Sequence, residues 1–401
     1  MPEPGKVVIV SQHYPPDSST TAAIMARISE HLAAETPVLV LSGTSGSATG
    51  DSTPSGRPAV IEIKHRIPAK AALIKRAAAE ACFTLRAFMA LLRRLQRGDV
   101  AITVTAPFML PYAVAAAARL KRARSVLIMH DLYPDVLVMA GLLKPASVMA
   151  KAMRTANGLM FRALDAVVII GRDTERLLSR YRGITPGKIR FIPNWATLAS
   201  GVRPIRPDNR YRRPHAARFV AGLSGNLGFT HDPLIVFEAA RSLRDDPDIH
   251  FLLSGWGIGF ERLRQMQSEA SLPNVTLVDR VEDENLEEFL SAADVWLIPY
   301  RRNVAGVSVP SRFYNLLAVG RPVILVSEPD AEAALTVTEH DVGWVVPPGK
   351  SDELARTIRR AACSEDPSRA ERAAAIAGRF DFAQVMASYS RLIRELRQNA
   401  G

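Results

Sequence analysis

The chain has 401 residues, of which 48% are hydrophobic and 23% charged, so it is long enough for two domains with full cores and has a globular composition. No apolar run approaches the length of a membrane span, and Cys82 and Cys363 have no metal-ligand spacing. We therefore expect no signal peptide, no transmembrane helix and a cytoplasmic location.

The net charge of +11 is unevenly distributed along the chain. Residues 1–200 carry 26 Lys+Arg against 13 Asp+Glu, whereas the remaining 201 residues carry 25 against 27. A basic half indicates nucleic acid or an anionic membrane surface as a partner. Neither a zinc-ligand spacing nor an RNA-binding aromatic signature accompanies the charge, so we expect a membrane surface and no nucleic acid.

Short runs of apolar, mostly β-branched residues alternate with helical patterns through the first half. Strands are expected at VVIV from Val7, VLVL from Val38, VIEI from Val60, VAITV from Val100, SVLIM from Ser125 and AVVII from Ala166. Helical patterns between them include Thr21 to Ala34, Leu73 to Arg97 and Ser147 to Leu164. This alternation is typical of a parallel sheet connected by crossover helices.

The second half repeats the pattern after a break. Strands are expected at FVAGL from Phe219, HFLLSG from His250, VTLV from Val275, VWLIP from Val295, VILVS from Val323 and GWVV from Gly343. The break at 199–217 is rich in Arg and Pro and is predicted to be a linker, and the Gly/Ser/Thr-rich segment 42–56 a mobile loop. The predicted fold class is α/β, with doubly wound domains at 1–198 and 218–380 facing each other across a cleft. A C-terminal helix at 381–401 is expected to pack back toward the first domain.

The stretch VPSRFYNLLAVGRPVI, from Val309 to Ile324, places an arginine at the start of a short helix. Ser311 is the expected N-cap, and Gly320 is expected to end the helix in a left-handed turn. A cation at the positive end of a helix is unfavourable by roughly 0.3–1 kcal/mol unless an anion is near. Arg312 therefore indicates a bound phosphate at the carboxyl edge of the sheet. A solvated or carboxylate-paired arginine is the alternative.

Two glycine turns lie at the ends of expected strands in the second half. LSGNLGFTHDP contains Gly225, Asn226 and Gly228 before a helix that starts near Pro233, and SGWGIG contains Gly255. Glycines at such turns let the main chain approach a pyrophosphate, although many glycine turns bind nothing. Together with the Arg312 loop, these turns predict a site for a nucleotide diphosphate at one edge of one sheet.

The first half has two polar segments at strand ends. MHDLYPDV places His130 and Asp131 after an expected strand, and HYPPDSSTTA places Ser19 and Thr20 before an expected helix. The histidine is either a structural, hydrogen-bonded residue or part of the site in the cleft. The serine and threonine are either N-caps or cleft residues.

The helical pattern from Leu73 to Arg97 is amphipathic and basic, which suits contact with anionic lipid. An ordinary core-facing helix with a solvated basic side is equally compatible with this periodicity. Its apolar residues include Leu85, Phe88, Met89, Leu92 and Leu95, and its basic residues are Lys75, Arg76, Arg86, Arg93, Arg94 and Arg97.

The segments GITPGKIRFIPNWA (183–196), SGNLG, ADVWLIPY and PSRFYNLLAVGRPVI together resemble the GT-B-fold retaining glycosyltransferases of family 4. The resemblance is to bacterial enzymes of O-antigen and colanic-acid-type exopolysaccharide assembly in particular, and it covers nearly the whole chain. It implies the GT-B fold of two Rossmann-like domains and a UDP- or GDP-linked sugar held by the second domain. It further implies retention of anomeric configuration, no cofactor and no obligatory metal ion.

Residue by residue, the resemblance places Asn226 and His231 where the family has an Arg and a Lys that contact the diphosphate. Arg312, beside Ser311 in the donor-binding loop, would then supply the missing cation. His130 matches a family histidine near the transferred sugar and the reacting carbon.

Two further positions depart from the family pattern. Ser19 and Thr20 fall where many members have two glycines that face the phosphate. Asn315 stands where the family has the second of two glutamates, the one that binds the ribose. The first glutamate would fall at Val307 or Ala305, and neither residue is acidic.

These observations predict a retaining glycosyltransferase that acts on a saccharide acceptor linked to polyprenyl diphosphate, as a peripheral protein at the inner face of the plasma membrane. Two alternatives fit the same fold: a nucleotide-sugar epimerase, which would need paired carboxylates in the cleft, and a non-catalytic nucleotide-sugar-binding partner. Release of nucleotide diphosphate would separate transfer from mere binding.

Overall fold

The structure is a computed structural model that describes residues 5–49, 56–64, 73–214, 218–364 and 366–398. Contacts between residues divide the chain into two units. Unit 1 runs to Ile170 and adds Glu175–Ile192 and the segment from Met386, whereas unit 2 contains Gly171–Thr174 and Pro193–Val385. Residues 50–55 of the expected mobile loop lie outside the described residues.

Unit 1 is built on a seven-stranded sheet in the order β3-β2-β1-β4-β5-β6-β7, with every neighbouring pair parallel. The central strands are buried along their whole length, as in parallel sheets covered by helices on both faces. The strands are β1 (Val7–Ser11), β2 (Val38–Ser42), β3 (Ala59–Glu62), β4 (Val100–Val104), β5 (Arg124–Met129), β6 (Ala166–Ile169) and β7 (Ile189–Phe191).

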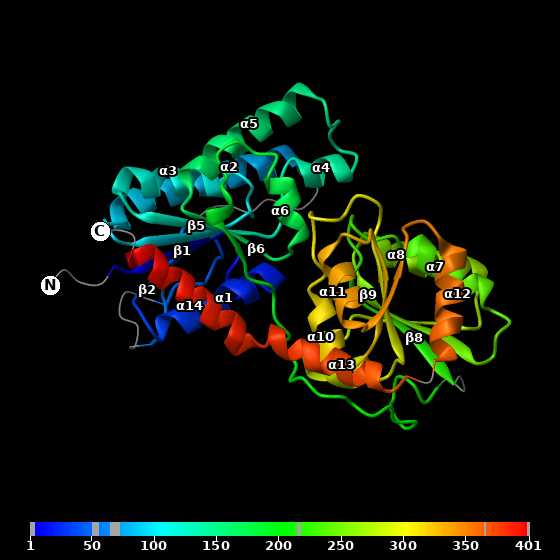
Figure 1. Cartoon of the computed structure of the whole chain (residues 1–401). Coiled ribbons are helices and arrows are strands. Elements are labelled where there is room, and N and C mark those ends of the chain that lie inside the picture. The colour runs from blue at the N-terminus through cyan, green and yellow to red at the C-terminus, as the bar shows by residue number, and fades with distance from the viewer. Residues whose placement is uncertain (1–4, 50–55, 65–72, 215–217, 365, 399–401) are drawn as a thin grey trace. The chain divides into compact units, whose positions relative to one another are not determined.

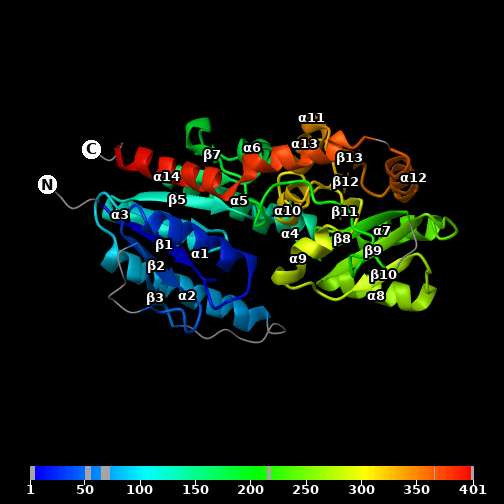
Figure 2. The same ribbon diagram turned by 90° about the horizontal axis from the view of Figure 1, so that it is seen from below.

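Two layers of helices cover this sheet. Helices α2, α3 and α5 lie over one face, and α1 and α14 lie over the other (Figure 1 and Figure 2). The helices are α1 (Thr20–Ala33), α2 (Leu73–Arg94), α3 (Leu110–Lys121), α4 (Asp135–Met139), α5 (Val148–Ala163), α6 (Asp173–Leu178), the 3₁₀ turn η1 (Pro186–Lys188) and α14 (Phe382–Gln398).

Unit 2 contains a six-stranded parallel sheet in the order β10-β9-β8-β11-β12-β13. The chain leaves β8 toward β9 on one side and returns to β11 on the other, so the strand order reverses between β8 and β11. The strands are β8 (Phe219–Asn226), β9 (Ile249–Trp256), β10 (Val275–Val278), β11 (Val295–Pro299), β12 (Val323–Val326) and β13 (Gly343–Val346).

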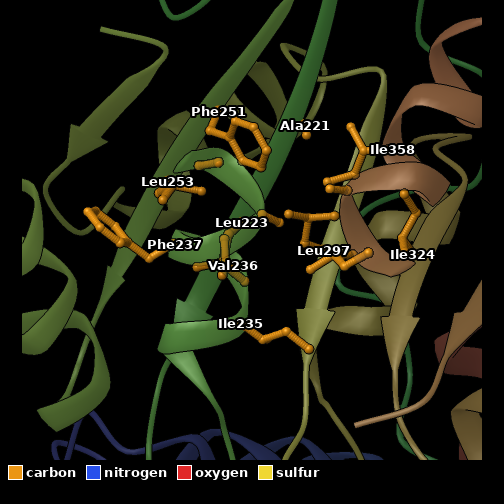
Figure 3. Packing of buried hydrophobic residues seen from close by; sticks show 14 of the residues in the cluster. Ala221, Leu223, Ile235, Val236, Phe237, Phe251, Leu253, Leu297, Ile324 and Ile358 are labelled. Carbon is orange, nitrogen blue, oxygen red and sulfur yellow. The ribbon is translucent and has the colours of Figure 1, made fainter. Parts of the chain in front are cut away.

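The core of unit 2 lies between this sheet and the helices α7, α8 and α12. Phe237 of α7 and Ile358 of α12 point toward strand residues such as Leu253 and Leu297 (Figure 3). Helices α10, α11 and α13 lie on the opposite face (Figure 1). The helices are α7 (Pro233–Ser242), α8 (Ile258–Ala270), α9 (Leu286–Leu290), α10 (Arg312–Ala318), α11 (Glu332–His340), α12 (Ser351–Ala362) and α13 (Ser368–Ala377), and the 3₁₀ turns are η2 (Asp283–Asn285) and η3 (Gly378–Phe380).

Every expected strand is present, and together the two doubly wound sheets confirm the predicted α/β fold class. Strand β7 was not expected from the residue pattern. It has only three residues, and none of them is fully buried, so it forms no apolar run.

The segment expected to be a linker is part of unit 2 as far as it is described. The main-chain N–H groups of Gly201 and Arg203 donate to the carbonyl oxygens of Ala318 and Val319 at 2.9 and 3.2 Å. Its arginines also bind unit 2, because Arg212 donates to the carbonyl oxygens of Ala292 and Arg218. The low apolar content of this segment therefore reflects polar anchoring rather than the absence of contacts.

The short segment Gly171–Thr174 after β6, which includes the first two residues of α6, also belongs to unit 2. The Arg172 guanidinium pairs with the buried carboxylate of Glu332 at 2.9 Å and with Glu339 at 3.1 Å. Asp173 Oδ2 accepts hydrogen bonds from the main-chain N–H groups of Gly306 and Glu332. Asp173 thereby satisfies a donor at the first turn of α11.

The segment from Met386 groups with unit 1, which places most of α14 there. Ser390 Oγ donates to Glu35 and lies 3.0 Å from Nε2 of His31 on α1. Within the described part of the chain, no helix is both long and apolar enough to cross a membrane.

One buried ion pair holds the beginning of the unit 2 sheet together. Asp294, next to β11, accepts hydrogen bonds from the Val220 N–H of β8 at 2.6 Å and from Arg212 at 2.7 Å. We expect Asp294→Ala to lower the free energy of unfolding of unit 2 by about 3 kcal/mol, because it leaves a buried guanidinium unpaired. Urea unfolding followed by tryptophan fluorescence reports this unit, because Trp195, Trp256, Trp296 and Trp344 all lie in it.

The matched control is Asp245→Ala, since the Asp245 side chain is 90% exposed and pairs only at the surface with Arg244. If both variants unfold at the same urea concentration, the Asp294 contacts contribute nothing specific.

Candidate functional site

Two glycine turns meet at the carboxyl edge of the unit 2 sheet. Gly225 near the end of β8 pairs in register with Gly255 of β9. A Cβ atom added at Gly255 would lie 2.2 Å from the Gly225 carbonyl oxygen, and Gly225 itself has a φ of +127°. Both positions therefore require glycine, one for space and the other for its backbone conformation. The edge lies beside the strand-order reversal, where α/β sheets bind ligands.

A third glycine belongs to the same turn and was not among the predicted site residues. Gly257 has a φ of +92°, and a Cβ atom there would lie 2.4 Å from Oδ1 of Asn226. The exposed Asn226 side chain thus covers the second glycine turn. Any side chain at position 257 would collide with it. The signal was present in SGWGIG, where Gly257 alternates with Gly255.

Arg312 lies over the first glycine turn. A Cβ atom placed at Gly225 would be 3.9 Å from Nε of Arg312. Burial lowers the pKa of this guanidinium. Asp283 raises the pKa and Arg280 lowers it, each by less than burial does. No residue in the described ranges forms an ion pair or hydrogen bond with the Arg312 side chain. A half-buried cation without a partner is costly, so its position favours an anion at this turn.

Ser311 does not cap α10, and this expectation was wrong. Its backbone is already helical, with φ −59° and ψ −32°, and its side chain makes no capping hydrogen bond. An N-cap needs an extended backbone to turn its side chain onto the first N–H groups. The exposed hydroxyl therefore stays free for another partner, and its predicted place among donor-binding residues is still a prediction. Gly320 ends the segment with φ +70°, as expected.

His231 lies near the same turn but carries no charge at neutral pH. Its ring packs against Tyr300 with a centroid distance of 5.0 Å, and Nδ1 lies 3.0 Å from Oγ1 of Thr230. Burial, with a smaller effect from Arg301, lowers the pKa of His231 to about 4. His231 therefore adds no positive charge to this turn at neutral pH, whereas Arg312 does.

The Asn315 side chain is occupied within unit 2. Its Oδ1 accepts hydrogen bonds from the main-chain N–H groups of Thr197 and Leu198 at 2.7 and 3.3 Å, and its Nδ2 donates to Thr197 Oγ1 at 2.9 Å. Asn315 is buried and fixes the segment that enters unit 2. Its role toward a ribose is still a prediction.

Two further residues near the glycine turns were missed. The Arg280 guanidinium lies 4.7 Å from the centroid of the Trp256 ring, next to Gly257. This stacking places an aromatic and a cationic group beside the turn. Trp256 lies inside SGWGIG, whereas Arg280 is the second residue after β10, in a polar segment without a motif.

In unit 1, His130 follows β5 directly at the carboxyl edge of the sheet. Its Nε2 is buried and has no hydrogen-bond partner among the described residues, and burial lowers its pKa to about 4. The neighbouring Asp131 has its pKa raised by burial, and its main-chain N–H donates to Thr105 Oγ1 at 3.2 Å. A buried polar atom without a partner is rare in native structures, so the site favours a ligand group at Nε2.

Ser19 and Thr20 begin α1. Ser19 Oγ accepts a hydrogen bond from the Ala22 N–H at 3.3 Å, so it is an N-cap, and Thr20 is the first helical residue. Of the two alternatives for Ser19, the structure shows the N-cap. A role of Ser19 or Thr20 toward a phosphate is still a prediction. Among the described residues, no three His, Cys, Asp or Glu side chains gather as metal ligands.

Two family models match the chain in order. The model described as "Glycosyl transferase 4-like domain" matches residues 19–195, and the one described as "Glycosyl transferases group 1" matches residues 218–363. The glycosyltransferase WbjE of Pseudomonas aeruginosa is 26% identical over 77% of this chain and 78% of its own length. The colanic acid biosynthesis glycosyl transferase WcaI of Escherichia coli is 26% identical over 74% of each chain.

Solved structures share the fold over nearly the full length. Sucrose-phosphate synthase from Thermosynechococcus elongatus has a TM-score of 0.74 at 18% identity, covering 98% of this chain and 99% of its own. The HepE protein of Anabaena, solved in complex with UDP, has a TM-score of 0.67 at 17% identity, covering 97% and 100%. The first matched range covers most of unit 1, with its polar strand ends, and the second covers most of unit 2, with its glycine turns. The chain therefore belongs to the GT-B-fold glycosyltransferases of family 4.

Proposed function

We propose that this glycosyltransferase moves a sugar from a UDP- or GDP-linked donor to a lipid-linked saccharide, with retention of anomeric configuration. The observation that carries the proposal is the Arg312 guanidinium over Gly225, half-buried and unpaired within the described residues. A diphosphate at the glycine turns would give this cation a partner and would use the close main-chain approach that Gly225 and Gly255 allow.

The choice of a nucleotide sugar is supported by the structural neighbours. HepE has been solved with UDP, with UDP and glucose, and with UDP-glucose. The stacked pair of Trp256 and Arg280 offers a contact surface for the base of the nucleotide, because a planar ring can stack on either group.

The mechanism that we propose needs few protein groups. The acceptor hydroxyl attacks the anomeric carbon from the face that the diphosphate leaves, so that the carbon–oxygen bond to phosphate breaks as the new glycosidic bond forms. The hydroxyl proton passes to an oxygen of the departing diphosphate. Arg312 stabilises the charge that develops on this leaving group, and His130 Nε2 orients a sugar hydroxyl. We propose that Arg312 takes the role a divalent cation has in other glycosyl transfers, so that no metal ion or other cofactor is required.

The acceptor and the location rest on charge and on relatives. WcaI is named for colanic acid biosynthesis, and a further structural neighbour, WaaG, is described as a glycosyltransferase involved in lipopolysaccharide biosynthesis. A lipid-linked saccharide, which is the acceptor that we propose, is amphiphilic because its sugars are polar and its lipid is apolar. The surplus of 13 basic residues in 1–200, against two extra acidic residues in 201–401, supports work at the anionic inner face of the plasma membrane.

Pure protein incubated with UDP- and GDP-linked sugars tests the reaction class. We expect slow release of UDP or GDP by hydrolysis and faster release when a lipid-linked saccharide is added. If no donor releases its nucleotide with any acceptor while a nucleotide still binds, the chain binds nucleotide sugars without transferring them.

The role of Arg312 gives a binding prediction. Arg312→Ala should weaken nucleotide-diphosphate binding by about 1.5–3 kcal/mol, the scale of hydrogen bonds to charged groups, and should also lower turnover. Arg312→Lys should restore only part of the affinity, because a point charge cannot make a forked pair of hydrogen bonds. Calorimetric titration with UDP and GDP measures both effects.

The matched control is Arg262→Ala on α8, which removes an exposed arginine from the same unit. Equal affinities of Arg312→Ala and wild type, combined with a lower unfolding temperature, would mean that Arg312 has a structural role only.

His130 gives a prediction about pH. Because burial holds its pKa at about 4, below the ordinary 6.5, the imidazole is neutral at pH 7 and titrates only in acid. His130→Ala should lower turnover about 100-fold, and the ratio of wild-type to variant turnover should stay constant from pH 6 to 8. A ratio that changes through pH 6.5 would show an exposed, ordinary histidine.

The same pKa affects stability. A folded-state pKa below the unfolded value gives a stability contribution that is fully present above pH 6.5 and is lost as the pH falls toward 4. His130→Asn cannot take up this proton, so its stability should fall less than that of wild type between pH 6.5 and 4.

A further inference from the structure

Helix α5 of unit 1 has apolar residues on two opposite sides. Its inner side is buried, with Met160 and Phe161 in the core under the sheet face. On its outer side, Val148, Met149 and Leu159 are 84%, 62% and 65% exposed. A helix that only covers a sheet needs one apolar side, so packing against the sheet does not account for the apolar residues on the outer side.

The exposed residues of α5 form a continuous stripe. Val148, Ala152, Thr155, Leu159 and Arg162 follow one another at spacings of three and four residues and are all exposed. Such spacing places side chains in one row along a helix. The row contains no acidic residue and ends in an arginine, and we call it the α5 stripe.

A cavity of about 750 Å³ adjoins the α5 stripe. It is lined by Thr155, Leu159 and Arg162 of the stripe and by Arg180 and Arg182 of the segment after α6. These three arginines make no ion pair with any residue for which the structure gives a position. The cavity therefore combines an apolar edge with unpaired guanidinium groups.

The single carboxylate of this cavity is already engaged. Asp135 accepts a hydrogen bond from the Tyr181 hydroxyl at 3.1 Å and lies 3.8 Å from Arg154, which also lines the cavity. A paired Asp135 cannot neutralise the remaining arginines, so the cavity keeps a surplus of positive charge. Guanidinium groups in such an arrangement match phosphate oxygens.

The same layer of helices concentrates the positive charge of the protein. Residues 73–164, which contain α2, α3 and α5, carry 14 Lys+Arg against 4 Asp+Glu. Helix α2 adds two exposed apolar residues, Leu85 at 63% and Met89 at 43%, whereas its Phe83 and Leu91 are buried in the core. Among the residues whose side chains the structure describes, α2 thus has a core-facing side and two exposed large apolar residues, whereas α5 has three, Val148, Met149 and Leu159.

We propose that the α5 stripe and its arginine cavity bind the surface of an anionic phospholipid bilayer. The exposed apolar side chains enter the interface between headgroups and acyl chains, and Arg162, Arg180 and Arg182 contact lipid phosphates. Charge complementarity and the exposed apolar row together favour a bilayer over a soluble protein partner. This inference deepens the proposed membrane location, because it names the surface that contacts the bilayer. It rests on the proposed function only for the reason why the protein would bind a membrane.

Sedimentation of the full chain with vesicles, without any sugar donor, tests this surface. Wild type should bind vesicles of equimolar phosphatidylglycerol and phosphatidylcholine and should not bind phosphatidylcholine alone. Arg162→Glu with Arg182→Glu should lower the partition coefficient by about thirtyfold or more, and Val148→Ser with Leu159→Ser by about tenfold. The control pair Arg262→Glu with Arg356→Glu changes charge equally on exposed positions of unit 2 and should leave binding within about twofold.

Three outcomes would overturn the proposal. One is a loss of vesicle binding in the control pair as large as that in Arg162→Glu with Arg182→Glu. This result would mean that binding depends on the net charge of the protein and not on this surface. Another is a larger loss for Leu85→Ser with Met89→Ser than for the α5 pair, which would place the contact on α2. The last is release of the protein from the vesicles by inorganic phosphate at an ionic strength at which chloride does not release it. This result would assign the cavity to free phosphate. Because no donor is present, vesicle binding and sugar transfer can fail independently, and circular dichroism of each variant verifies folding.

Discussion

The carboxyl edge of the unit 2 sheet depends on the approach of two strand ends, where the Gly225 carbonyl oxygen occupies the space that any side chain at Gly255 would need. This contact requires glycine at position 255, and the φ of +127° favours glycine at position 225. The Arg312 side chain, which comes from helix α10, lies 3.9 Å from where a Cβ atom at Gly225 would be. The two glycines and the arginine therefore share one small region of the edge.

The parallel sheets could be predicted because buried strands need uninterrupted apolar, β-branched runs, and each run had the length of one strand. Prediction failed where polar groups replaced apolar ones. Strand β7 is short and partly exposed, and residues 199–214 are held by arginine and main-chain hydrogen bonds rather than by apolar packing. Hydrophobic periodicity does not detect either kind of anchoring.

The candidate site was partly readable from the sequence. Glycine turns at strand ends and an arginine at a helix start indicate a phosphate through local chemistry, and the structure brings Gly225, Gly255 and Arg312 together. The environment of a side chain depends on distant residues, however. The hydrogen bonds of Asn315 come from Thr197, far earlier in the chain, and the charge state of His231 follows from burial against Tyr300. No pattern near either residue contains that information.

The membership of Gly171–Thr174 in unit 2 bears on how this protein can be divided. A truncated gene product that starts at Pro193 would include every strand of the second sheet but would lack Arg172 and Asp173. Its Glu332 carboxylate would stay buried without a counter-ion, and the first turn of α11 would lose the acceptor of a main-chain N–H. The boundary between the two units therefore does not fall at one point of the sequence. A protein in which the segment from residue 193 is exchanged for that of a relative would have to restore the contacts of Gly171–Thr174.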